Sequence, residues 1–433
     1  MTAPESAALL TSTDSTASAS HDGGSGSRFA GYVELSARRR WFALVALALG
    51  GFGIGVTEFV SMGLLPNIAQ DLLPGIYAVS PADANATAGH LISAYALGVV
   101  VGAPTIAAAA ARWPRKRLLL VLVSAFVIGN LATVILPSFG WIIASRFIAG
   151  LPHGAYFAIA SLVAGSLLGP GKRAKGIAFV LGGLTIANVV GVPLGTYLGQ
   201  NFGWRSAFLL VTVIFVLTLV AILITVPMIA GDPASTMRRE LRALGRPQVW
   251  LTLGLAAIGF GGMFAVYTYI APVITDVTGL SAALVPWILV TFGVGMTVGN
   301  FTGGWAADRS VALSLIVFMS GLVVALVVFG LSAASLPGLL VGTFFVAAFS
   351  SAVSPAIQAR LMDIAHDSQS LAAALNHSAL NIGNALGAFL GGLVIAAGFG
   401  YLAPSFVGVG LAVVGVLILS ISLAIERRQA NTP

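Results

Sequence analysis

Long apolar runs separated by short polar segments recur along the chain from Trp41 onward. We count twelve runs, centred roughly on residues 53, 99, 127, 153, 187, 217, 259, 295, 322, 350, 384 and 415, and each allows the ~20 residues that an α-helix needs to cross ~30 Å of hydrocarbon. The pattern therefore predicts an all-α integral membrane protein with twelve transmembrane helices, which we call spans 1 to 12.

Composition agrees with this interpretation. Of the 433 residues, 58% are hydrophobic and 8% are charged, whereas a soluble domain has about 25% charged residues. An ordinary soluble enzyme is therefore excluded. The chain has no Cys, so disulfides and Cys-based metal sites are excluded as well.

The basic residues indicate topology. The net charge is +7, but the Lys and Arg residues stand in short clusters between apolar runs, so we expect no nucleic-acid partner. All but Arg146 and Arg205 of the 21 Lys and Arg residues fall on one side of the twelve-span map. The positive-inside rule then places both termini in the cytoplasm and the loop 66–87 outside.

The two halves of the chain repeat each other. Gly98, Gly102 and Arg112 match Gly295, Gly299 and Arg309 at an offset of 197, and Asn188, Gly191 and Gly195 match Asn384, Gly387 and Gly391 at an offset of 196. Parallel repeats of this kind place a substrate site near the membrane midplane, between the halves.

The expected domains follow from the repeat and the polar segments. Residues 1–37 form a flexible cytoplasmic tail, 38–230 an N-terminal six-helix half, 231–247 a cytoplasmic linker, 248–425 a C-terminal six-helix half and 426–433 a cytoplasmic tail.

Glu58 is the acidic residue that lies deep inside a predicted span. A carboxylate in hydrocarbon costs several kcal/mol unless it is paired, hydrated or protonated, so Glu58 is a candidate proton site. The alternative is a structural carboxyl group that bonds to neighbouring helices.

Arg146 of span 4 lies at a similar depth, where it can pair with Glu58 or compete for a proton. The alternative for Arg146 is an anchor whose side chain extends to the lipid headgroups.

Other polar residues inside spans are candidates for the proton pathway and the substrate cavity. His153 is a candidate proton relay, although a core histidine is the alternative. The candidate cavity residues are Tyr267, Tyr269, Asn188, Asn381, Asn384 and His377. Most of these can equally form hydrogen bonds between helices.

Span 5 contains Gly183, Gly191 and Gly195 around Pro193. Glycine removes side-chain bulk and proline removes a backbone donor, so this helix can bend and pack tightly. We expect the close packing of Gly191 and Gly195 to be against the other half of the protein; plain packing glycines are the alternative.

Two equivalent loops carry charges that can act as an inner gate. The loop after span 8 contains Gly304, Asp308 and Arg309, which can hold a helix end or bridge to another helix. The first-half loop keeps Arg112 and Arg115 but has Ala111 where the aspartate would be. Its basic cluster can also be a topology signal alone.

Several enzyme motifs are absent from the sequence. It contains no GxxxxGK[ST], complete GxGxxG, HExxH or GxSxG motif, so nucleotide hydrolysis and dinucleotide, zinc-protease and serine-hydrolase chemistry lack support. We expect no enzyme activity and no cofactor, and energy must come from a gradient.

The chain resembles the major facilitator superfamily, in particular its twelve-span drug:proton antiporter branch, which includes arabinose-type sugar efflux permeases and chloramphenicol exporters. The resemblance covers about residues 40–425. It rests on the strings TEF around Glu58, GAP at Gly102–Pro104, RFIAGLPHG, NVVGVPLG with its following GWR, and NHSALNIGNALGA at Asn376–Ala388.

The resemblance implies the major facilitator fold and export of a small drug-like molecule or sugar by alternating access, with protons entering as substrate leaves. It places the family's antiporter motif on Gly183–Gly195, its span-4 arginine on Arg146 and its gate motifs on Arg112–Arg117 and Gly304–Arg309. Ala111 departs from the gate pattern. We expect a monomer in the bacterial cytoplasmic (inner) membrane whose partners are substrate, protons and lipid.

Two other function classes stay open from sequence. A passive facilitator or importer shares the fold, and a membrane receptor would show no flux. The sequence does not distinguish drug, sugar and nucleoside cargo.

Overall fold

The computed structural model describes residues 35–110, 112–168, 173–230, 245–365 and 369–430. Within these ranges the chain is helical, and twelve segments are long and apolar enough to cross a membrane. Each predicted span centre falls inside one of them. The prediction of an all-α protein with twelve transmembrane helices is therefore confirmed.

The first half contains the elements before residue 230. They are α1 (Ala37–Gly63), α2 (Leu65–Leu72), α3 (Pro74–Val79), α4 (Pro81–Ala88), α5 (His90–Ala110), α6 (Arg115–Ile135), α7 (Phe139–Gly150), α8 (His153–Leu168), α9 (Arg173–Ile186), the π-helical turn η1 (Ala187–Gly191), α10 (Val192–Phe202) and α11 (Arg205–Thr225).

The second half contains the elements after residue 245. They are α13 (Pro247–Gly254), η3 (Leu255–Gly259), α14 (Gly261–Tyr267), α15 (Ile270–Pro272), η4 (Val273–Val277), η5 (Ala282–Leu284), α16 (Val285–Ala307), α17 (Val311–Ser332), α18 (Leu336–Ala365), α19 (Gln369–Val394), η6 (Ile395–Phe399) and α20 (Ala403–Ala430).

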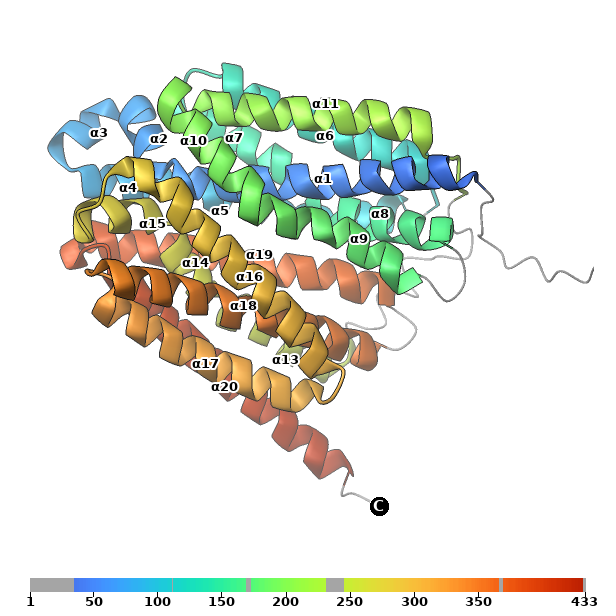
Figure 1. Ribbon diagram of the computed structural model, residues 1–433. Helices are drawn as coiled ribbons and strands as arrows, with labels where there is room; N and C mark the ends of the chain where they lie inside the picture. Colours follow the sequence, from blue (N-terminus) through green and yellow to red (C-terminus); the bar gives the residue numbers. More distant parts are fainter. Residues whose placement is uncertain (1–34, 111, 169–172, 231–244, 366–368, 431–433) are drawn as a thin grey trace, which may run out of the picture.

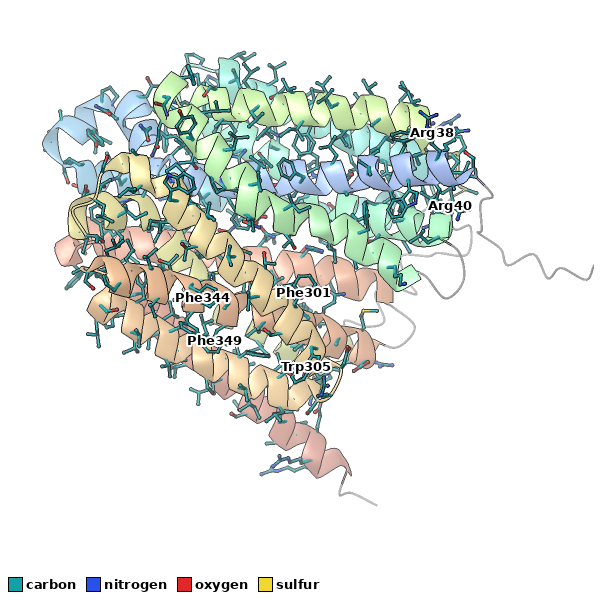
Figure 2. The ribbon with its side chains drawn as sticks, in the orientation of Figure 1. Arg38, Arg40, Phe301, Trp305, Phe344 and Phe349 are labelled. Carbon is teal, nitrogen blue, oxygen red and sulfur yellow. The ribbon has the colours of Figure 1, made fainter. Side chains whose placement is uncertain are left out.

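The long helices run between two ends of a bundle (Figure 1). We call the end that holds Arg38, Arg40 and Trp305 the basic end (Figure 2); Arg115, Arg309 and Arg427 also belong to it. The other end, where α2, α3 and α4 lie, is called the opposite end. Local sequence sets several helix limits: Ser36 accepts a hydrogen bond from the Arg39 amide and begins α1, and Gly203 ends α10 with φ 85°, which favours glycine.

Buried apolar side chains form separate cores and one shared core. One cluster contains only residues of the first half, and another contains only residues of the second half. A third joins Phe59 and Met62 of α1 to Met263 and Tyr267 of α14. The first helices of the two halves therefore contribute to a core that both halves share. The predicted domain limits stay predictions, and most of the 1–37 tail and of the 231–247 linker lies outside the described residues.

The internal repeat is visible in the packing of glycines. A Cβ on Gly98 or Gly102 of α5 would collide with the backbone carbonyls of Phe147 and Leu151. In the second half, a Cβ on Gly295 or Gly299 of α16 would collide with the carbonyls of Phe344 and Ala348. These four contacts repeat at the offset of 197 found in the sequence, so the two halves use glycine for the same close helix approach.

Hydrogen bonds join the halves at the opposite end. Asn85 Nδ2 donates to Tyr401 Oη at 2.8 Å, and Gln200 Nε2 donates to the carbonyl of Ala282 at 2.9 Å. Nearer the middle, Ser93 Oγ donates to the carbonyl of Ala385 at 3.2 Å. The halves are thus fastened together at the opposite end.

Arg205, one of the two exceptions to the basic-side pattern, has a local partner. It forms an ion pair with Asp71 of α2, and Trp204 Nε1 donates to the same carboxylate at 2.9 Å. The hydrogen bonds from Trp204 and Arg205 hold the pKa of the Asp71 carboxyl below its usual range. Arg205 therefore fastens α2 to the start of α11 at the opposite end.

Candidate functional site

Glu58 lies on α1, at the contact between the two halves. Its side chain is buried, and Asn384 Nδ2 of α19 donates a hydrogen bond to Glu58 Oε1 at 3.3 Å. Within the described part of the chain the carboxyl group makes no ion pair. Since Glu58 and Asn384 belong to different halves, a relative movement of the halves changes the surroundings of this carboxyl group.

Arg146 is held by the residue next to Glu58. Its side chain is 1% exposed, and its guanidinium donates to Thr57 Oγ1 at 3.0 Å, to the Thr57 carbonyl at 2.6 Å and to Asn130 Oδ1 at 3.5 Å. It also lies over the rings of Tyr95 and Phe208, at 4.6 and 5.0 Å from their centroids.

These contacts correct two sequence-based alternatives. Arg146 is not a headgroup anchor, because its side chain is buried. It does not form an ion pair with Glu58 either, because its hydrogen bonds go to Thr57 and Asn130. The guanidinium instead bonds to the turn of α1 that carries Glu58.

A group of aromatic rings lies beside Glu58. Phe59 of α1 stacks on Phe264 of α14 with a centroid distance of 6.2 Å, and it lies 5.7 Å from the ring of Tyr267. Tyr267 stacks face to face on Phe292 of α16 at 3.6 Å. The Tyr267 hydroxyl is buried, and in the described residues it has no hydrogen-bond partner. Flat apolar surface and one open polar group therefore meet where the halves touch.

The three candidate asparagines also have unpaired side-chain oxygens. The side-chain oxygens of Asn188, Asn381 and Asn384 are buried, and none has a hydrogen-bond partner among the described residues. Their amide nitrogens donate to Leu184, His377 and Glu58, respectively. A buried polar atom without a partner costs about 1–3 kcal/mol, and a ligand that donates a hydrogen bond removes that cost.

His153 and His377 face each other across the halves. Their ring centroids are 5.9 Å apart, and His377 stacks on Phe157 of α8 at 5.4 Å. His153 Nδ1 lies 3.1 Å from the Tyr95 hydroxyl. On α19, His377 lies seven residues from Asn384, which is about 10 Å along the helix toward the basic end. The pair therefore lies on the basic-end side of Glu58.

Tyr269 does not join this group. Its hydroxyl donates to the carbonyl of Ala388 at 2.8 Å, and it fills the space left by Gly89 of the first half and Gly392 of α19. The structure therefore gives Tyr269 a packing role where the halves meet, not a place among the residues around Glu58.

The span-5 glycines contact α1, not the second half. A Cβ on Gly183 would collide with the Ala48 carbonyl, and a Cβ on Gly191 or Gly195 would press on Val56 and its neighbours in α1. The expectation that these glycines pack against the other half is wrong. That contact is made by Gly293 of α16, where a Cβ would collide with the backbone of Asn188. Pro193, at the start of α10, is buried.

Neighbouring glycines of α9 provide a matched test of this packing. Gly182 has open space at its Cβ position, whereas Gly183 abuts the α1 backbone. We expect Gly183→Val to lower thermal stability in detergent by about 1–3 kcal/mol or more, the cost of an overpacked contact, and Gly182→Val to leave it unchanged. Equal melting temperatures for both variants would contradict the packing of α9 on α1.

Within the described residues, the two loops of the expected inner gate make local hydrogen bonds. Arg309 Nη1 donates to the carbonyl of Trp305 at 2.9 Å, and its guanidinium lies 3.6 Å from the Trp305 ring centroid. Asp308 and Arg112 are exposed, and Arg115 Nε donates to the carbonyl of Ala230. The second loop was expected either to hold a helix end or to bridge to another helix. Arg309 holds the end of its own helix in this conformation. Gly304 has open space at its Cβ position, and Ala111 lies outside the described residues.

Sequence reasoning missed four residues of the site. Thr57, Asn130 and Tyr95 hold or cover Arg146, and Phe292 stacks on Tyr267. Asn130 had a usable signal, because it is a polar residue inside an apolar run. Phe292 had none, since phenylalanine is common throughout the spans. Within the described residues, no group of three or more His, Asp or Glu side chains is placed to hold a metal ion.

Known proteins are similar to this chain in sequence and in fold. The family model described as Major Facilitator Superfamily matches residues 47–285 and again 253–433. The "Inner membrane transport protein YdhP" of Escherichia coli (strain K12) is 39% identical over 391 residues, which cover 90% of this chain and 97% of the relative. A "Chloramphenicol resistance protein" of Streptomyces lividans is 33% identical over 87% of this chain and 94% of its own length.

A solved structure with low sequence identity has the same fold. The crystal structure of a D-xylose-proton symporter superimposes with a TM-score of 0.70 at 17% identity, over 88% of this chain and 97% of that chain. At this identity the likeness shows the fold alone.

Proposed function

Because the chain belongs to the major facilitator superfamily of membrane transporters, we propose that it exports a small amphipathic molecule in exchange for protons. The cargo class, the direction and the coupling ion are the parts of this proposal that go beyond family membership.

The observation that carries the proposal is the Glu58 carboxyl group. It is buried, lacks an ion pair within the described residues, and bonds to Asn384 of the other half. A buried carboxylate without an ion-pair partner is costly, and binding a proton removes the cost. When the halves move apart around Glu58, its bond to Asn384 breaks and water can supply or accept that proton.

The residues around Glu58 favour an amphipathic cargo. Phe59, Phe264 and the stacked pair Tyr267 and Phe292 offer flat apolar surface. The open amide oxygens and the Tyr267 hydroxyl favour a cargo that donates hydrogen bonds. The name of the Streptomyces relative supports a drug-like cargo of this type. Both halves of a single chain contribute these residues, so the site needs no second copy.

A substrate panel in an efflux-deficient bacterial strain tests the proposal. The panel holds chloramphenicol, other aromatic drugs, arabinose and nucleosides, and export is measured as reduced accumulation with and without a protonophore. We expect at least one amphipathic aromatic compound to be exported, and export to stop when the proton gradient is dissipated. Export that survives the protonophore would indicate a passive facilitator, and no flux for any compound would support a receptor.

Cysteine labelling tests the sidedness of the proposal. The chain has no native Cys, so Val79→Cys in α3 and Arg427→Cys in α20 each create a unique thiol at an exposed position. With both termini in the cytoplasm, a membrane-impermeant maleimide should label the residue-79 variant in intact cells and the residue-427 variant only after lysis. The reverse pattern would invert the topology.

A further inference from the structure

A groove runs along the side of the bundle, between the two halves, away from the Glu58 group. It lies between α10 and the start of α16, reaches Asn67 of α2, and has a volume of about 670 Å³. This volume falls within the ~300–1,000 Å³ range of small-molecule sites. We call it the lateral groove.

The lateral groove opens to the bilayer. Its flanking side chains Leu194, Tyr197 and Trp287 are 47%, 54% and 69% exposed. The exposed apolar surface continues along α16 to Phe301 (Figure 2). A bundle face this apolar is covered by lipid when the helices span a membrane, so an occupant of the groove must come from the bilayer.

Polar side chains lie in the part of the lateral groove that is nearest the opposite end of the bundle. Asn67, Gln200 and Asn201 lie there, and Gln200 also bridges the halves through its bond to the Ala282 carbonyl. The Asn67 amide makes no hydrogen bond within the described part of the chain, so it can bind a ligand. The residues that line the groove include no charged side chain.

Apolar groups line the deeper part of the groove. Leu194 and Pro193 lie about 9 Å or more from Gln200 along α10, and Val290 lies one turn deeper than Pro286 on α16. Tyr197 and Trp287 flank the transition, as aromatic residues do at membrane interfaces. Polarity therefore falls from the membrane surface toward the midplane, as it does along a phospholipid.

We propose that the lateral groove binds a phospholipid without net charge, whose headgroup and ester region bond to the amides of Asn67, Gln200 and Asn201 and whose acyl chain lies on Leu194 and Val290. An anionic headgroup would find no cation among the lining residues. Since the lipid contacts both halves beside the bond from Gln200 to Ala282, it stabilises the closed contact at the opposite end. This site does not depend on the identity of the cargo or on proton coupling.

Photolabelling of the full chain tests the proposal. The protein is reconstituted in vesicles of phosphatidylethanolamine and phosphatidylglycerol with a trace of phosphatidylethanolamine that carries a diazirine on its acyl chain, and labelled peptides are mapped by mass spectrometry. We expect labelling of α10 and the start of α16 above that of α11, whose Val220 is exposed to lipid to a similar degree as Leu194. Added unlabelled phosphatidylethanolamine should compete, and phosphatidylglycerol should not.

A matched pair of variants makes the test specific. Ala283→Trp places a large side chain in the groove, and Val220→Trp places one on the lipid-facing side of α11. We expect Ala283→Trp to reduce labelling of α10 about tenfold, equivalent to a loss of about 1.4 kcal/mol in binding, and Val220→Trp to leave it unchanged. Both variants are compared by their elution and melting in detergent. Labelling of α10 no higher than that of α11, equal competition by phosphatidylglycerol, or unchanged labelling in a folded Ala283→Trp protein would overturn the proposal.

Discussion

Glu58→Gln is expected to abolish export against a concentration gradient while the protein stays folded in the membrane. Gln has the shape of the protonated side chain, and its oxygen can still accept the hydrogen bond from Asn384. The carboxyl group can no longer exchange a proton, so cargo movement should become passive. In antiport, proton and cargo each weaken the binding of the other by about 1–3 kcal/mol, or roughly 5–150-fold, and this dependence of cargo binding on pH should disappear.

Export assays and binding assays across a pH range measure this effect with the cargo that the panel identifies. Asp363→Asn is the matched control, because it also neutralises a carboxylate but at an exposed position near the end of α18, and it should export as the wild type does. If the Glu58→Gln protein still exports uphill with unchanged pH dependence, the coupling site is elsewhere, and His153 becomes the next residue to test.

Arg146→Leu should reduce export about a hundredfold. Hydrogen bonds to a charged group contribute about 1.5–3 kcal/mol each, and Arg146 makes two to Thr57, next to Glu58. Loss of both corresponds to about 3–6 kcal/mol, and the lower bound is equivalent to about a hundredfold. Arg146→Lys should retain most of the defect, because one ammonium group cannot replace a planar guanidinium that reaches both Thr57 oxygens.

Transport rates at matched protein levels check this prediction, with Arg205→Lys as the control. Arg205 also bonds to a neighbouring helix, but its pair with Asp71 is partly exposed, so its replacement should cost at most about 1 kcal/mol. Full activity of Arg146→Lys would mean that the positive charge matters and that the geometry around Thr57 does not.

The fold could be predicted from sequence because the bilayer imposes strict requirements on it. Each span must be apolar over about 20 residues, so the runs in the sequence located all twelve spans within the described chain. The repeat was visible for a similar reason: Gly98 and Gly295 must both lack a side chain where a backbone carbonyl approaches. Such positions can be recognised as glycines in the sequence, without knowing which helix packs against them.

Contacts between helices could not be predicted in the same way. Periodicity shows that Arg146 and Glu58 lie at similar depths, but it does not show which side of each helix faces the other. The guanidinium therefore bonds to Thr57 and Asn130, where pairing with Glu58 was one of the alternatives. The same limit explains Gly191, since its spacing indicates a close contact but not whether α1 or the second half makes it.

Proton movement driven by cargo tests the central claim most directly. Wild-type protein and the Glu58→Gln variant are reconstituted in proteoliposomes that contain a pH-sensitive dye, and an outward gradient of the identified cargo is imposed without a pH gradient. Cargo leaving through the wild-type protein should draw protons inward, whereas the variant should release cargo with no change in internal pH. Cargo release without proton movement in the wild type, or equal proton movement in both proteins, would contradict the claim.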